Sequence, residues 1–145
     1  MSAGYSGTPL ARKLGIRPGA LVALLPGTAP AAATIARVLE KQVDGSVRIR
    51  TDLRLRAPHD VVVVFVRSRR ELAALFERAR ARLTVAGGLW VAWPKQSSAL
   101  AGELRESAVR SHGLASGLVD NKVCAIDEDW SGLRFVVRLE DRPGR

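Results

Sequence analysis

The sequence predicts an α/β fold of three layers, in which helices cover both faces of a mainly parallel β-sheet that ends in an antiparallel hairpin. Short apolar runs bounded by turn residues recur at 20–25, 61–66 and 89–93, as buried strands do. Segments with helical spacing of apolar residues alternate with these runs, which indicates a parallel sheet. The last two apolar segments, 118–126 and 133–139, are joined by a short, turn-rich connection typical of an antiparallel hairpin.

The chain is expected to open with a short helix and a buried strand. Thr8 suits the N-cap, and Pro9 suits the first helical position, where a missing N–H costs nothing. Gly15 is expected to end this helix at position C′. Residues 20–25 (ALVALL) form the first strand, and a helix follows over 30–40 because its apolar residues fall on one face.

Residues 47–56 alternate between aliphatic and arginine side chains. A period of two predicts an amphipathic strand with an arginine-bearing face, which we place at a sheet edge where that face stays wet. Asp52 interrupts the pattern, so the alternative is a short strand followed by an extended loop. The arginines of the alternating pattern are Arg48, Arg50, Arg54 and Arg56.

The central part of the chain predicts a strand, a capped helix and a third buried strand. Residues 61–66 (VVVVFV) are β-branched and uncharged, and Ser68 with Glu71 forms a capping box before a helix that reaches about Leu83. Gly87-Gly88 is expected to break the chain before the strand at 89–93.

The C-terminal part predicts one more helix before the hairpin. The helix spans 104–112 with Gly113 at its C′ position, and the hairpin turn spans 127–132. We expect one domain over residues 1–140 and a frayed tail at 141–145.

Composition excludes several classes of protein. The 145 residues carry 23 basic and 14 acidic side chains, a net charge of +9. The single cysteine rules out an intramolecular disulfide and a zinc site built on clustered cysteines. No apolar run approaches the roughly 18–20 residues of a membrane span, and no signal peptide opens the chain. We therefore expect a cytoplasmic protein with no membrane contact and no bound metal, of unspecified oligomeric state.

The predicted topology is Rossmann-like, and a terminal hairpin is how class I methyltransferase folds end. A dinucleotide or S-adenosylmethionine (SAM) site needs a glycine-rich first loop so that the backbone approaches the ligand closely. The loop at 25–30 holds one glycine and two prolines. Asp52 stands where an acidic ribose ligand would follow the second strand, but it lies among arginines. We therefore predict a degenerate, non-binding loop and no cofactor.

Catalytic constellations are absent from the sequence. Cys124 lies in the middle of a predicted strand, and a buried, unreactive thiol is expected there because the sequence offers no obvious thiolate-stabilising partner. The two histidines, His59 and His112, lie before a strand and near a helix end. No Ser-His-Asp order, metal motif or P-loop is present.

Direction along the sheet places several distant segments at one edge. The carboxyl ends of parallel strands meet at this edge of the sheet. We therefore expect three segments to converge there: the residues after the third buried strand, the hairpin turn and the start of the opening helix. This predicted ligand or partner surface consists of Tyr5, Ser6, Thr8, Trp93, Lys95, Asp127, Asp129 and Trp130. The structural alternative is that Lys95 bridges the acidic turn and the aromatic rings pin the N-terminal arm to the sheet.

Four segments resemble a bacterial family catalogued as domain of unknown function 3052, which is common in actinobacteria. They are GYSGTPL (4–10), LWVAWPK (89–95), LVDNKVCAID (118–127) and WSGLR (130–134). The resemblance covers nearly the whole chain, and residues 26–56 match least. It implies a small stand-alone cytoplasmic protein and no assigned activity.

These observations favour a non-catalytic module that binds a small molecule or a protein on a degenerate methyltransferase-like scaffold. One alternative is a divergent SAM-dependent methyltransferase. The other is a weak, sequence-blind nucleic-acid binder that uses the arginines of 48–56, joined by Arg67, Arg69, Arg70, Arg78, Arg80 and Arg82. No aromatic residue lies within 48–56, so stacking of bases is not expected there.

Overall fold

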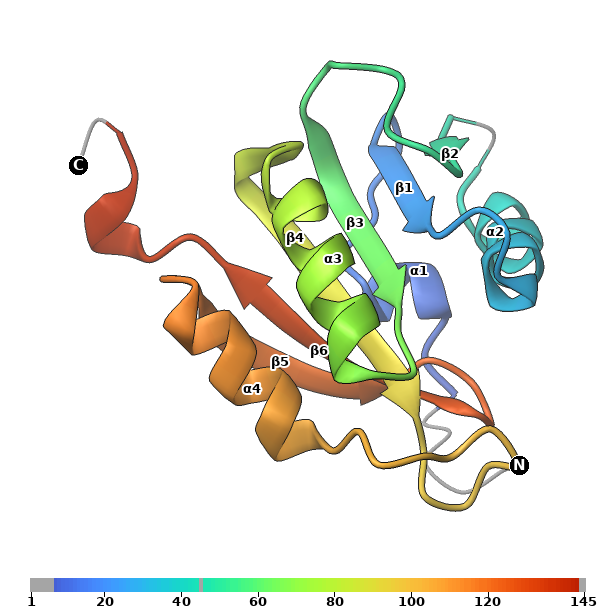
Figure 1. Cartoon of the computed structure of the whole chain (residues 1–145). Helices are drawn as coiled ribbons and strands as arrows, with labels where there is room; N and C mark the ends of the chain where they lie inside the picture. Colours follow the sequence, from blue (N-terminus) through green and yellow to red (C-terminus); the bar gives the residue numbers. More distant parts are fainter. Residues whose placement is uncertain (1–6, 45, 144–145) are drawn as a thin grey trace.

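The predicted fold class is confirmed by the computed structural model, which describes residues 7–44 and 46–143. A six-stranded sheet has the order β2-β1-β3-β4-β6-β5 (Figure 1). The first four strands are mutually parallel, whereas β6 runs antiparallel to both of its neighbours. The strands are β1 (Leu21–Leu25), β2 (Arg48–Arg50), β3 (His59–Phe65), β4 (Leu83–Pro94), β5 (Val119–Ala125) and β6 (Trp130–Val136).

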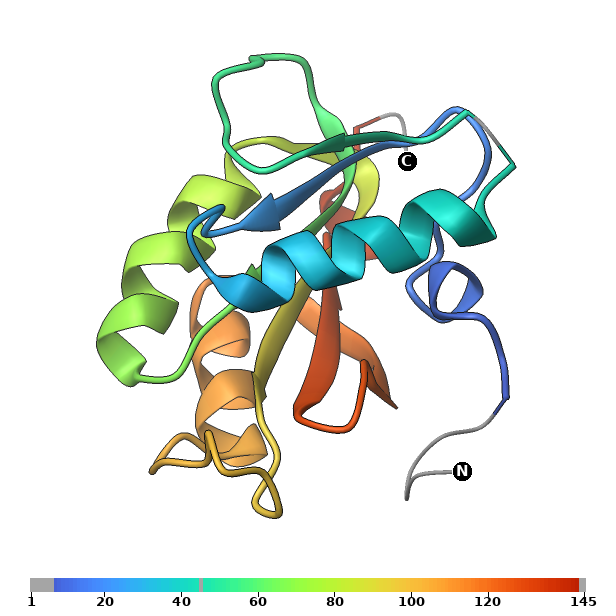
Figure 2. The same ribbon diagram turned by 90° about the vertical axis from the view of Figure 1, so that its right-hand side faces the viewer.

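Helices form a layer on each face of the sheet. Figure 1 shows α3 and α4 in front of the strands, and Figure 2 shows α2 along the opposite face, with α1 beside it. The helices are α1 (Leu10–Lys13), α2 (Pro30–Gln42), α3 (Arg69–Arg80) and α4 (Glu106–Ala115), and a 3₁₀ turn, η1, follows at Leu139–Asp141. Two apolar cores result, one under α1 and α2 and one under α3 and α4.

Strand β3 supplies both cores. Val61, Val63 and Phe65 face the core under α1 and α2, and the residues between them face the core under α3 and α4. Every residue from 61 to 66 is at most 2% exposed. Burial on both faces explains why the segment is uninterrupted and β-branched, since each buried valine side chain stabilises the fold by roughly 1.5 kcal/mol or more.

The ends of α1 follow one prediction and depart from another. Gly15 ends the helix at φ +77°, and the N–H of Ile16 donates to the carbonyl of Ala11 at 2.8 Å, as in a Schellman motif. The expected N-cap at Thr8 is displaced by one residue, because Pro9 occupies the N-cap and its carbonyl accepts from Lys13.

The capping box of α3 is confirmed. The N–H of Glu71 donates to Ser68 Oγ at 3.1 Å. The Glu71 carboxylate in turn accepts from the N–H of Arg67 at 2.7 Å, one residue before the N-cap. The helix nevertheless ends at Arg80, so its expected extension to Leu83 is wrong and Leu83 begins β4.

The expected break at Gly87-Gly88 is also wrong, because both glycines lie inside β4. The register between β3 and β4 shifts before Gly88. A Cβ at Gly88 would collide with the Arg134 guanidinium and lie 2.9 Å from its Cζ. The glycine therefore serves the close approach of a side chain from β6 rather than a turn.

The predicted end of α4 at Gly113 is wrong for a similar reason. Gly113 lies within the helix and faces the ring of Phe135, which a Cβ there would strike. The helix ends at Ala115, and Gly117 supplies the positive φ (+92°) that follows it.

The hairpin is confirmed with different limits. Its second strand begins at Trp130, which was expected in the turn, and ends at Val136. The predicted C-terminal tail begins inside η1, and residues 144 and 145 lie outside the described residues. Among the residues that the structure describes, no helix has the length and apolar character to cross a membrane.

Candidate functional site

The strand order places a crevice at the carboxyl ends of β1 and β3. The chain leaves β1 for β2 on one side and returns to β3 on the other, and ligands in open α/β sheets bind where the order reverses in this way. A pocket of about 380 Å³ opens there. This switch-point pocket is lined by Ala29, Pro30, Ala31, Thr34, Phe65, Arg67, Glu71, Leu100, Asp127, Asp129 and Trp130.

Two aromatic rings form the apolar part of the switch-point pocket. Phe65 ends β3 and Trp130 begins β6, and their rings meet edge to face with centroids 5.2 Å apart. Trp130 is 6% exposed and pairs with Pro94 at the end of β4, so the sheet holds its ring in place.

The hairpin turn contributes two carboxylates held by hydrogen bonds. Asp127 Oδ1 accepts from the N–H groups of Asp129 and Trp130, both at 2.8 Å. Asp129 Oδ1 accepts from Ser98 Oγ at 2.8 Å, which ties the turn to the segment after β4. In both residues these hydrogen bonds involve the same carboxylate oxygen, Oδ1.

Arg67 and Glu71 complete the polar lining. Arg67 directly precedes α3, and its guanidinium donates to the carbonyl of Leu100, in the segment after β4, at 3.2 Å. Three carboxylates and one guanidinium line the pocket, so its formal charge is negative although the chain is strongly basic. The combination of aromatic floor and anionic rim suits a partly apolar ligand with a positively charged nitrogen.

The structure brings together part of the predicted surface. Asp127, Asp129 and Trp130 line the switch-point pocket, and Thr8 lines a neighbouring pocket of about 240 Å³ together with Asp127. Trp93 is 5% exposed and packs in the core under α3 and α4. Tyr5 and Ser6 lie outside the described residues.

Lys95 lies beside the acidic turn through its backbone. Its N–H donates to the carbonyl of Asp129 at 2.8 Å. Within the described residues the Lys95 ammonium forms no ion pair with the turn, so the side-chain bridge of the structural alternative is not present there.

Sequence reasoning missed several residues of the pocket, namely Thr34, Phe65, Arg67, Glu71 and Leu100. The carboxyl end of the strand at 61–66 was a usable signal for Phe65 and Arg67, because ligands in parallel sheets bind at exactly such ends. Leu100 carried no signal, since only the folded segment after β4 brings it to the pocket.

The loop between β1 and α2 differs from a nucleotide cradle. Pro26 and Pro30 have no N–H, and the N–H of Ala29 donates to the Pro26 carbonyl at 3.0 Å. Gly27 packs against the segment after β2, where an added Cβ would collide with the carbonyl oxygen of Thr51. The loop and the segment after β2 therefore lie in close contact at this point.

The nucleophile and histidine candidates lie away from the switch-point pocket. Cys124 is half-buried on β5, not fully buried as expected. Burial raises the pKa of its thiol, and the ammonium groups of Lys13 and Lys122 oppose that shift. His59 is fully buried at the start of β3, at the opposite edge of the sheet. Its burial lowers the pKa of the imidazole.

The arginines of 48–56 do not share one strand face. Arg48 and Arg50 flank Ile49 on β2, the edge strand, and all four arginines of the pattern are exposed. Arg54 and Arg56 belong to the loop after it, because Asp52 Oδ1 accepts the N–H of Arg54 at 3.0 Å and turns the chain away from the sheet. The second of the two expected conformations, a short strand and a loop, is thus confirmed.

Comparisons with solved structures identify the fold. A SAM-dependent methyltransferase from Aquifex aeolicus superposes with a TM-score of 0.64 at 12% identity, covering 89% of this chain and 88% of that one. A ribosomal protein L11 methylase from Lactobacillus delbrueckii subsp. bulgaricus gives 0.59 at 12% identity, covering 90% and 75%. Fibrillarin from Aeropyrum pernix with bound SAM gives 0.51 at 16% identity, covering 92% and 70%.

At these identities the likeness establishes a methyltransferase-like fold and no activity. No curated protein matches the sequence. A family model described as "Protein of unknown function (DUF3052)" matches residues 11–139.

Proposed function

Because the chain belongs to the DUF3052 family of proteins of unknown function, we propose a function from its geometry: it is a non-catalytic module that binds a small amine-bearing molecule in the switch-point pocket. The observation that carries this proposal is the position of an anionic, aromatic-floored pocket at the carboxyl ends of β1 and β3. The close packing of Gly27 against Thr51 in the loop after β1 supports a ligand other than a nucleoside.

The charge of the lining supports an amine as the recognised group. A primary ammonium accommodates several carboxylate oxygens, and the hydrogen bonds that hold Asp127 and Asp129 fix those oxygens in advance. Phe65 and Trp130 provide apolar surface for the rest of the ligand. The volume of about 380 Å³ is within the range of small-molecule sites.

The hydrogen bonds of the lining residues support a binding role. Among the lining residues that the structure describes none is a histidine, cysteine or lysine, and the three carboxylates, which could act as general acids or bases, each accept a hydrogen bond from the backbone or from Ser98. The Thr34 hydroxyl donates to the carbonyl of Pro30 at 3.2 Å, so it is not held by a general base.

The test is a calorimetric titration with tyramine and agmatine as amine probes, on the wild type and on the double variant Asp127→Asn/Asp129→Asn. Asparagine keeps an oxygen that accepts the same hydrogen bonds, so the turn is preserved while two charges are removed. We expect the double variant to bind at least about tenfold more weakly, the loss typical of hydrogen bonds to a charged group.

Glu128→Gln is the matched control, because Glu128 is exposed in the same turn and does not line the switch-point pocket. It should leave the affinity within about twofold, since a rim charge outside the contact is largely screened. Equal losses in the control and the double variant, or no binding of either amine by the wild type, would refute the proposal.

A further inference from the structure

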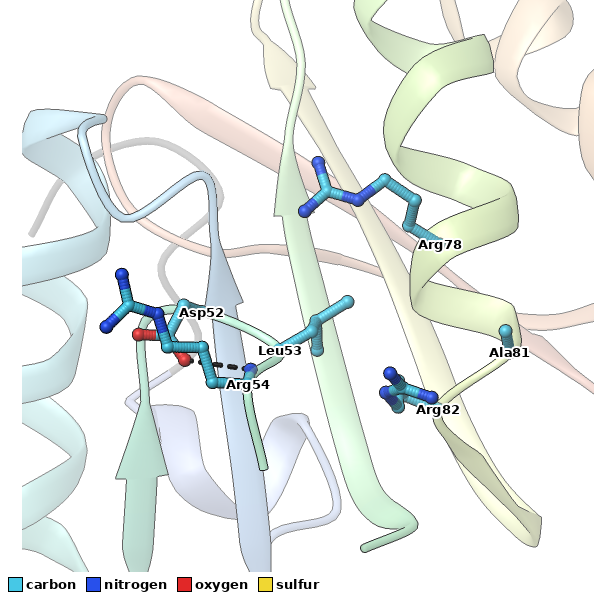
Figure 3. A pocket seen from close by; sticks show the side chains of 6 residues that line it. All are labelled: Asp52, Leu53, Arg54, Arg78, Ala81 and Arg82. Atoms are coloured by element: carbon cyan, nitrogen blue, oxygen red, sulfur yellow. Dashed lines mark hydrogen bonds between the residues drawn. The ribbon is translucent and has the colours of Figure 1, made fainter. Parts of the chain in front are cut away.

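A further pocket lies away from the switch-point pocket, between the loop after β2 and the C-terminal end of α3. Its volume is about 460 Å³. We call it the arginine pocket, and it is lined by Asp52, Leu53, Arg54, Arg78, Ala81 and Arg82 (Figure 3). The turn at Asp52 brings one arginine-rich segment of the sequence beside another that is more than 20 residues distant.

The arginine pocket holds an excess of positive charge. Three guanidinium groups accompany one carboxylate, and within the described residues none of the three arginines forms an ion pair. Figure 3 shows the side chain of Arg78 extending from α3 toward β3 and Arg82 below it, after Ala81, whereas the guanidinium of Arg54 lies on the far side of Leu53 and points away from both.

One donor of the arginine pocket lacks an acceptor. The Nε–H of Arg82 is buried and has no hydrogen-bond partner in the part of the chain that the structure describes. A buried polar group without a partner costs free energy. Because the Nε–H is buried, an oxygen acceptor in the pocket would have to meet the terminal nitrogens of this guanidinium.

We propose that the arginine pocket binds a phosphate group. The N–H groups of an arginine guanidinium match the spacing of phosphate oxygens. The pocket also contains more guanidinium groups than are needed to neutralise its single carboxylate. None of the described residues that line the pocket is aromatic, so these residues offer a base no ring on which to stack. The phosphate belongs either to a small phosphorylated molecule or to a nucleic-acid backbone bound without regard to sequence.

A purely structural role would also place arginine here, because Arg78 lies in the last turn of α3, where a cation offsets the helix dipole. That role predicts a loss of stability on substitution and no change in phosphate affinity. Affinity for phosphate therefore separates the two explanations.

The experiment is calorimetric titration of the full chain with pyrophosphate and with a 12-nucleotide single-stranded DNA of mixed sequence, at 50 and 200 mM KCl. Arg78→Gln should weaken binding of the phosphate probe at least about tenfold, as for loss of a hydrogen bond to a charged group. Two phosphate contacts to the oligonucleotide, from Arg78 and Arg82, predict an affinity loss of roughly sevenfold between the two salt concentrations.

Arg37→Gln is the matched control, since Arg37 is exposed on α2, on the other face of the sheet, and its loss changes the net charge equally. Its affinity should stay within about twofold of the wild type, because Arg37 lies on the other face of the sheet and does not line the pocket. Asp52→Asn should tighten binding, since it removes the one repulsive charge of the pocket.

Where Arg78→Gln does not fold, Arg82→Lys provides the test, because it keeps the charge and removes the buried Nε–H. The proposal is supported as a small-molecule site by binding of pyrophosphate alone. The proposal is supported as a site for a nucleic-acid backbone if the oligonucleotide binds and added pyrophosphate displaces it. It is overturned if neither probe binds at 50 mM KCl, or if the pocket variants and Arg37→Gln weaken binding equally.

Discussion

Replacing Gly113 by alanine places two known effects in opposition, and the structure decides between them. Alanine in a helix interior is favoured over glycine by about 1 kcal/mol. The new Cβ would however lie 2.5 Å from Cδ1 and Cζ of Phe135, where carbon atoms in contact prefer about 3.5–4.0 Å. The ring cannot move away easily, because it is fully buried and packs edge to face against Phe76 at 5.6 Å.

A forced displacement of about 1 Å in a packed core costs up to roughly 3 kcal/mol. The net effect of Gly113→Ala is then a loss of about 1–2 kcal/mol in the free energy of unfolding. For a chain of 145 residues that lowers Tm by about 3–7 °C. The measurement is urea unfolding followed by circular dichroism, with thermal unfolding alongside it.

Gly102→Ala is the control for this substitution. A Cβ at Gly102 meets only the Arg67 carbonyl oxygen, at an ordinary 3.8 Å, so the free energy of unfolding should change by less than about 0.5 kcal/mol. If Gly113→Ala is instead more stable than the wild type, helix propensity outweighs the contact and the packing of α4 on Phe135 described here is incorrect.

Two further predictions concern titratable groups. Cys124 should react slowly with a thiol reagent at pH 7 and rapidly in denaturant, because burial raises its pKa and keeps the thiol protonated; rapid native labelling would contradict this. For His59 the folded-state pKa lies below the unfolded value near 6.5, so the unfolded chain takes up the proton first as the pH falls. The free energy of unfolding should therefore decrease as the pH falls from 7.5 to 5.5, and His59→Gln should flatten that decrease; an unchanged slope in the variant would show that other groups cause it.

The order of the elements could be predicted because it depends on local patterns. The run at 61–66 and the capping box at Ser68 are short-range signals, and both are confirmed. The glycines at 88 and 113 misled the same reasoning. A glycine interpreted as a turn or a helix stop is a local signal, whereas these two glycines make room for Arg134 and Phe135 from β6. Contacts between such distant segments cannot be recognised from the neighbouring sequence.

The candidate site was predictable where strand direction alone decides the position. The hairpin turn with Asp127 and Asp129 lies at the expected edge for that reason. The arginine pocket was not predictable as a unit, because it depends on the reversal of the chain at Asp52. The alternation of aliphatic and arginine residues was compatible both with a strand through Arg56 and with a short strand and a loop. Only the folded structure shows that the loop with Arg54 lines a pocket together with the end of α3.

Calorimetric titration of the wild-type chain with SAM tests the central claim most directly. The account predicts no binding of SAM in the micromolar range, because two prolines in the loop between β1 and α2 lack an N–H, the N–H of Ala29 is already bonded, and Gly27 packs closely against Thr51. A dissociation constant in the micromolar range or below would contradict it and would favour a divergent methyltransferase.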